Sequence, residues 1–147
     1  DHMSRWAKAY QVYLKNPRNR GSKLQLSPFD GLFESVERLH RGEAGGYGCL
    51  SGVCDTRFHT IDANGYKFGC TAINSESDNK NAKTNGVQVI NTDMLGLKRK
   101  VRQADCMNCE FKNICSSGCM ATEKMDDSLE CSGGYRLFKT IEKILRK

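Results

Sequence analysis

Apolar residues recur at intervals of three and four in four segments of the chain. These intervals place side chains on one face of a helix. We therefore expect helices at 4–15, 27–42, 94–103 and 135–147. The faces expected to be buried are Trp6, Ala9, Tyr10, Tyr13 and Leu14 in the first, Phe29, Leu32, Phe33, Val36 and Leu39 in the second, Met94, Leu97 and Val101 in the third, and Tyr135, Phe138, Ile141, Ile144 and Leu145 in the last.

Residues 57–70, "RFHTIDANGYKFGC", alternate apolar and polar side chains as strands do. Asn64 and Gly65 both tolerate positive φ, so this pair predicts a two-residue turn between antiparallel strands. The polar run 73–86 is expected to be a loop. The predicted fold class is therefore α+β, a small irregular domain with one β-hairpin, flanked by N-terminal linker helices and a C-terminal helix.

Composition limits the class of protein. A chain of 147 residues fits one domain, and 38% hydrophobic residues with a mean hydropathy of −0.61 support only a modest core. Eight cysteines predict extra cross-linking by metal or disulfide. No long apolar run predicts a membrane span, and "DHM" at 1–3 is interpreted as a tag remnant rather than a secretion signal. We expect a cytoplasmic protein, in which dense cysteines more often bind metal.

The formal charge of +6 is concentrated in "LKRKVR" at 97–102. Eight metal-bound thiolates would add about −8 and two [4Fe–4S] cores about +4, leaving a net charge near +2. We therefore expect the basic excess to balance cluster charge, and neither nucleic acid nor membrane is an expected partner. The charged helix is expected to be a solvated face, with one side buried against the clusters.

Four cysteines lie close together in "CMNCEFKNICSSGC", spaced Cys106-x2-Cys109-x5-Cys115-x3-Cys119. Disulfides suit the even total, but the tight first pair favours a metal turn. Structural zinc often uses two CxxC knuckles, and only one is present. A [4Fe–4S] cluster can take three thiolates from a short loop and a fourth from elsewhere. In bacterial two-cluster ferredoxins the fourth cysteine of a run binds the other cluster, and the same logic could apply to Cys119. Iron–sulfur binding is the favoured hypothesis.

The full spacing resembles the SPASM domain, the C-terminal extension of many radical S-adenosylmethionine enzymes. Its pattern is C-x(9–15)-G-x4-C, a gap, C-x2-C-x5-C-x3-C, a gap, and C. The matching positions are Cys54, Gly65, Cys70, Cys106, Cys109, Cys115, Cys119 and Cys131. The resemblance covers residues 45–147, and the helical segment before it resembles the linker from a radical domain. It divides the chain into residues 1–44, a tag remnant with linker helices, and 45–147, the cluster domain.

The resemblance implies two [4Fe–4S] clusters, because Cys49 occupies the place of an extra ligand found in members with two fully ligated clusters. It assigns Cys49, Cys54, Cys70 and Cys119 to cluster I, and Cys106, Cys109, Cys115 and Cys131 to cluster II. A free thiol at Cys49 would leave one iron of cluster I open. Gly65 is expected at the hairpin turn, and Gly118 where the backbone closely approaches a cluster.

The implied function is that of an auxiliary iron–sulfur domain, which transfers electrons and helps to dock a peptide or protein substrate. The chain lacks the C-x3-C-x2-C loop that binds S-adenosylmethionine, so no catalytic residue is expected here. S-adenosylmethionine and a third cluster would belong only to the parent enzyme, whose radical domain is the expected partner within the same chain. The alternative is a zinc-binding structural or interaction module with no redox role.

Overall fold

The computed structural model describes residues 2–19, 26–53, 57, 60–61, 67–68, 83–84, 87–88 and 92–146. All four predicted helices are present in these ranges. They are α1 at His2–Lys15, α2 at Phe29–His40, α4 at Thr92–Asp105 and α5 at Tyr135–Leu145, with short 3-10 turns η1 at Pro17–Asn19 and η2 at Gly48–Ser51. None of the described helices is long and apolar enough to cross a membrane.

Two short antiparallel pairs lie between α2 and α4. Strand β1 at Thr60–Ile61 pairs with β2 at Lys67–Phe68, and β3 at Lys83–Thr84 pairs with β4 at Val87–Gln88. Asn64 and Gly65 lie outside the described residues, so the hairpin turn and the α+β class stay predictions. Strand β3 falls within the run 73–86, which the sequence predicted to be a loop.

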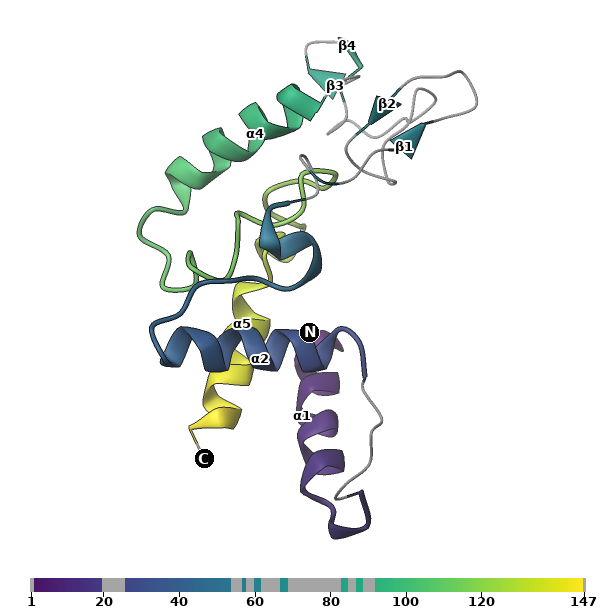
Figure 1. The fold of residues 1–147 in the computed structure, drawn as a ribbon, viewed down its shortest axis with the longest axis vertical. Coiled ribbons are helices and arrows are strands. Elements are labelled where there is room, and N and C mark those ends of the chain that lie inside the picture. Colours follow the sequence, from purple (N-terminus) through teal and green to yellow (C-terminus); the bar gives the residue numbers. More distant parts are fainter. Residues whose placement is uncertain are drawn as a thin grey trace.

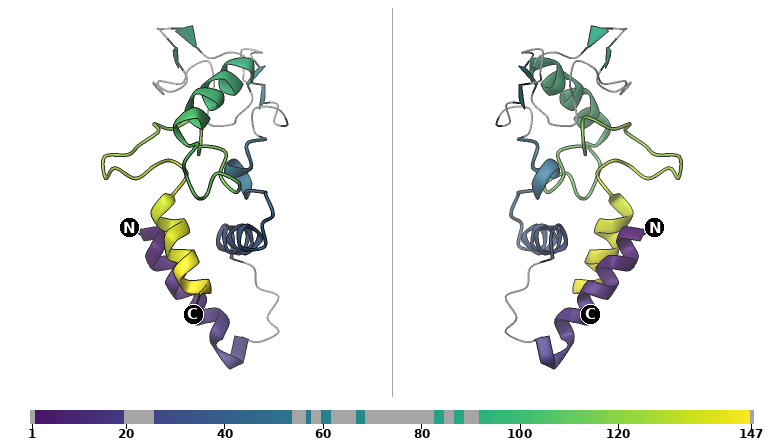
Figure 2. Two further views of the ribbon diagram at one scale, coloured as in Figure 1. Left: turned by 90° about the vertical axis from the view of Figure 1, so that its left-hand side faces the viewer. Right: turned by 90° about the vertical axis from the view of Figure 1, so that its right-hand side faces the viewer.

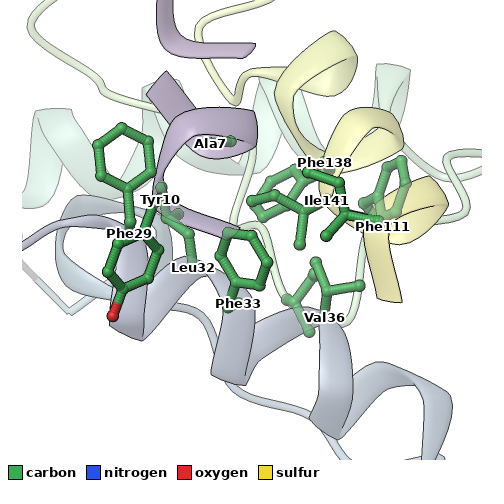
Figure 3. Close-up of a cluster of buried hydrophobic side chains, with 11 residues drawn as sticks. Ala7, Tyr10, Phe29, Leu32, Phe33, Val36, Phe111, Phe138 and Ile141 are labelled. Atoms are coloured by element: carbon green, nitrogen blue, oxygen red, sulfur yellow. The ribbon is translucent and has the colours of Figure 1, made fainter. Parts of the chain in front are cut away.

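The hydrophobic core lies among α1, α2 and α5. In Figures 1 and 2, α1 and α5 run side by side and α2 crosses them. The buried side chains meet as one cluster, shown in Figure 3. Its members are Ala7, Tyr10, Phe29, Leu32, Phe33, Val36, Phe111, Ile114, Phe138, Ile141 and Ile144.

The predicted faces of α2 and α5 are largely buried in this core, but α1 differs. Trp6 and Leu14 are 58% and 47% exposed, whereas Ala7 is fully buried beside Tyr10. A small side chain lets helix axes approach closely, so the contact face of α1 centres on Ala7. The aromatic residue with the largest apolar area, Trp6, is left outside it.

Helix α4 reverses the expected polarity of its faces. Leu97 and Val101 are 55% and 63% exposed, whereas Arg99 and Arg102 are 5% and 6% exposed. The side chain of Met94 lies outside the described part. The arginines are buried because their guanidinium groups donate to loop carbonyls that have no regular secondary structure to satisfy them. The expectation that this charged face is solvated is therefore wrong for both arginines.

Val36 and Val12 test where the core lies. Val36 is fully buried in α2 and Val12 is 70% exposed in α1, so both changes to alanine remove the same atoms from a helix. We expect Val36→Ala to lower the free energy of unfolding by about 2 kcal/mol, because it leaves a cavity. Val12→Ala should change it little. Urea unfolding followed by circular dichroism measures both, and equal effects would contradict this core.

Candidate functional site

Four cysteines line one cavity of about 40 Å³ between the loop after α4 and the start of α5. They are Cys106, Cys109, Cys115 and Cys131, the set that the family resemblance assigns to cluster II. The lining also includes Phe111, Phe138 and Gly133. Each of these four cysteines is partly buried, and all four are free thiols.

The ends of two helices position the cysteines of this cavity. Cys106 follows α4 directly, and its N–H donates to the carbonyls of Arg102 and Gln103 at 3.2 and 3.0 Å. The Cys109 N–H then donates to the Cys106 carbonyl at 2.9 Å, which closes the CxxC turn. Cys131 lies at the other wall, where its carbonyl accepts from the Gly134 N–H at 2.8 Å just before α5.

Two phenylalanines connect the cavity to the hydrophobic core. Phe111, between Cys109 and Cys115 in the chain, is 1% exposed, and Phe138 of α5 is 2% exposed. Their rings stack with centroids 5.2 Å apart and an interplanar angle of 29° (Figure 3). Because both rings line the cavity as well as the core, packing of the helices fixes the floor on which the thiols lie.

Hydrogen bonds also attach the cysteine loop to α5. The Tyr135 hydroxyl donates to Glu110 at 2.6 Å, and the Lys139 ammonium donates to the other oxygen of the same carboxylate at 2.8 Å. The hydrogen bond from Lys139 holds the pKa of Glu110 below its usual value, and the bond from Tyr135 adds to this effect. These hydrogen bonds add to the stack of Phe111 on Phe138 in holding the cysteine loop against α5.

Gly133 leaves space that a larger residue would fill. A Cβ at this position would lie 2.6 Å from the Cys115 sulfur and 3.8 Å from the Cys131 sulfur. The sulfurs of Cys115 and Cys131 belong to residues that line the cavity. Because glycine has no side chain, position 133 leaves room between these two thiols. By residue type, the four thiols and this glycine suit a thiolate-bound metal or iron–sulfur group, although no three such side chains among the described residues are arranged as a metal site.

Backbone N–H groups are directed at two of the sulfurs. Those of Ser117 and Gly118 donate to Cys115, and that of Phe111 donates to Cys109. Ser117 and Gly118 have φ of 66° and 79°, a left-handed pair that costs free energy at the serine. Donors of this kind stabilise negative charge on sulfur and tune the potential of iron–sulfur clusters.

Burial outweighs these donors while the thiols carry no metal. It raises the pKa of Cys115 to about 11, and it raises the pKa of Cys109 as well. Both thiols are thus protonated at neutral pH. A cation that binds them as thiolates has to displace their protons.

The other predicted ligands lie elsewhere. Cys119 and Cys49 do not line the cavity, although both belong to segments beside it. Cys49 is exposed in η2, and its neighbour Leu50 accepts a hydrogen bond from the Ser116 N–H at 2.9 Å. Cys54, Gly65 and Cys70 lie outside the described residues. Within the described ranges, no group of three or more His, Cys, Asp or Glu side chains is arranged to hold a metal ion.

Several residues of the site were not predicted from the sequence, among them Phe111, Gly133, Arg99 and Arg102. Gly133 lies two residues after Cys131, and this closeness to a predicted ligand was the only sign in the sequence that it belongs to the site. Arg99 and Arg102 are three apart in the basic run and so share a helix face, which a reading of the run as one charge patch overlooked. Gly118 was predicted where the backbone approaches a cluster closely, which stays a prediction; in the structure a Cβ there would meet the Ser132 Oγ at 2.2 Å.

Comparisons of the chain with protein-family models, with curated proteins and with solved structures find no match.

Gly133→Ala tests the room between the thiols. The added Cβ overlaps the Cys115 sulfur, and overpacking of this kind costs about 1–3 kcal/mol, so metal affinity should fall about fivefold or more. Gly42→Ala is the control, because its φ of +75° makes it destabilising while no atom lies within 4 Å of the new Cβ. Anaerobic Co²⁺ titration of both variants measures the affinity. An equal loss in the two would refute a local effect at Gly133.

Metal binding should release protons. Since burial raises the pKa of Cys109 and Cys115, raising the pH removes the protons that compete with metal, and affinity must increase. We expect Co²⁺ affinity to rise at least about tenfold per unit between pH 6 and 8. Thiolate-to-cobalt absorption reports binding, and Cys115→Ala should give a shallower slope. An affinity independent of pH would rule out binding by these thiols.

Proposed function

We propose that this chain is an auxiliary iron–sulfur domain of the SPASM kind, part of a radical S-adenosylmethionine enzyme that modifies a peptide or protein. The observation that carries the proposal is the grouping of Cys106, Cys109, Cys115 and Cys131 around one cavity. Five cysteines of the described chain lie between residues 106 and 131, and Cys119 alone among them is absent from this lining. The SPASM resemblance calls for the same division.

The four cavity cysteines would hold cluster II as thiolates. A bound cluster of this type accepts and donates single electrons. The chain's own residues would supply its surroundings: N–H donors at Ser117, Gly118 and Phe111, and the aromatic floor of Phe111 and Phe138 that limits access of water. Burial would disfavour negative charge on the cluster, and N–H donation would favour it. The balance of these two effects would set the reduction potential of the cluster.

The remaining parts of the proposal rest on the resemblance. Cys49, Cys54, Cys70 and Cys119 would hold cluster I next to the β-hairpin of an α+β domain. Residues 1–44 would link this domain to the radical domain, and the protein would work in the cytoplasm. Nucleic acid is not a proposed partner, since Arg99 and Arg102 of the basic run are committed to internal carbonyls.

Anaerobic reconstitution with iron and sulfide tests the function. We expect about eight irons and eight sulfides per chain, with an EPR signal after reduction. Cys106→Ala with Cys109→Ala should remove about four irons, because only one of the two sites loses ligands. Cys49→Ala should leave the signal of cluster II unchanged, which makes it the matched control.

Zinc binding is the competing outcome of the same experiment. Four thiolates also form a structural zinc site. Stoichiometric zinc in natively purified anaerobic protein, with no acid-labile sulfide, would overturn the iron–sulfur proposal in favour of a structural or interaction module.

A further inference from the structure

Cys119 lies near the four-thiol cavity but does not line it. Gly118, the preceding residue, packs against the edge of the four-thiol cavity, where its missing side chain would meet Ser132 Oγ at 2.2 Å and the Gly133 nitrogen at 2.7 Å. Cys119 therefore lies one residue from the segment that carries Cys131. It still does not line the cavity, so the orientation of the chain at this point separates it from the other four thiols.

One buried side chain fixes that orientation. The Arg102 guanidinium donates through Nη1 to the Cys119 carbonyl at 2.8 Å and to the Ser132 hydroxyl at 3.4 Å. Through Nη2 it donates to the Thr122 carbonyl. The acceptors on Cys119 and Thr122 belong to one segment, and the acceptor on Ser132 belongs to the segment that carries Cys131. A planar guanidinium holds its N–H donors in a rigid fork.

The position of Arg102 is set independently of these acceptors. It belongs to the last turns of α4, only four residues before Cys106, and it is 6% exposed. Arg99 holds the same loop by donating to the Ser116 carbonyl at 2.6 Å.

We propose that Arg102 is a positioning residue that keeps Cys119 out of the four-thiol site and so makes the run of cysteines serve two centres. Five thiols between residues 106 and 131 compete for four places, and a chain free to rotate at 119–122 would allow Cys119 to replace one of them. Arg102 prevents this exchange by holding the Cys119 and Thr122 carbonyls against α4 and Ser132. This inference rests on the proposed function, because it concerns how that site is assembled.

The experiment uses the full chain with Cys54→Ala and Cys70→Ala, which removes ligands of the second centre. The protein is loaded anaerobically with iron and sulfide and then treated with iodoacetamide, and the alkylated cysteines are located by peptide mass spectrometry. In this parent chain we expect Cys106, Cys109, Cys115 and Cys131 to be protected, with Cys119 alkylated.

Adding Arg102→Met should change the pattern of protection. We expect the rate of Cys119 alkylation to fall at least about fivefold while one or more of the four cavity cysteines becomes reactive, because a ligand exchange exposes the thiol that it replaces. Lys100→Met is the matched control, since it removes the same charge from an exposed position of the same helix. It should leave the pattern unchanged.

Arg102→Lys separates charge from geometry and serves if the methionine variant does not fold. An ammonium keeps the charge but lacks the fork, so Cys119 should again gain protection. Unchanged protection of the four cavity cysteines in a folded Arg102 variant, with Cys119 still reactive, would overturn the inference while leaving the proposed function intact. A parent chain that binds no iron and protects none of the four would instead overturn the proposed function, and the inference with it.

Discussion

The stack of Phe111 on Phe138 is the contact on which the arrangement of the chain depends. A loop that carries thiols has few regular hydrogen bonds, so other contacts must hold it in one conformation. Phe111, which lies between Cys109 and Cys115 in the sequence, holds the loop in place. Together with Ile114 it packs into a core otherwise built from α1, α2 and α5. Stability of the helices and geometry of the thiols are therefore coupled, and loosening either should disturb the other.

Buried arginines perform a similar task on the far side of the loop. Among the described residues, the segment 116–122 belongs to no strand pair, and Arg99 and Arg102 of α4 donate to its carbonyls at Ser116, Cys119 and Thr122. A guanidinium brings a positive charge with its donors. That charge is costly among neutral thiols and favourable beside thiolates, so the same side chains that order the loop also prepare it for an anionic group.

The cavity itself combines two opposing preferences. Burial keeps Cys115 protonated, whereas the N–H donors of Gly118 and Ser117 favour its thiolate. Such a site changes its charge state when a cation arrives, and the energy of metal binding then contributes to holding the loop. For a chain with a small apolar core, this coupling is a physical reason to concentrate cysteines in one place.

The sequence alone determined the four helices, because intervals of three and four residues leave a helix as the simplest way to bury one side of each segment. It also determined which cysteines are candidates, since spacing limits what a short loop can bring together. Tertiary structure decided the rest. Leu97 and Val101 are exposed while Arg99 and Arg102 are buried, because unsatisfied loop carbonyls outweigh the apolar preference of α4, and such carbonyls leave no trace in a hydrophobic pattern. The separation of Cys119 from its four neighbours likewise depends on contacts between residues far apart in the chain, made only once α4, the loop and α5 are in place.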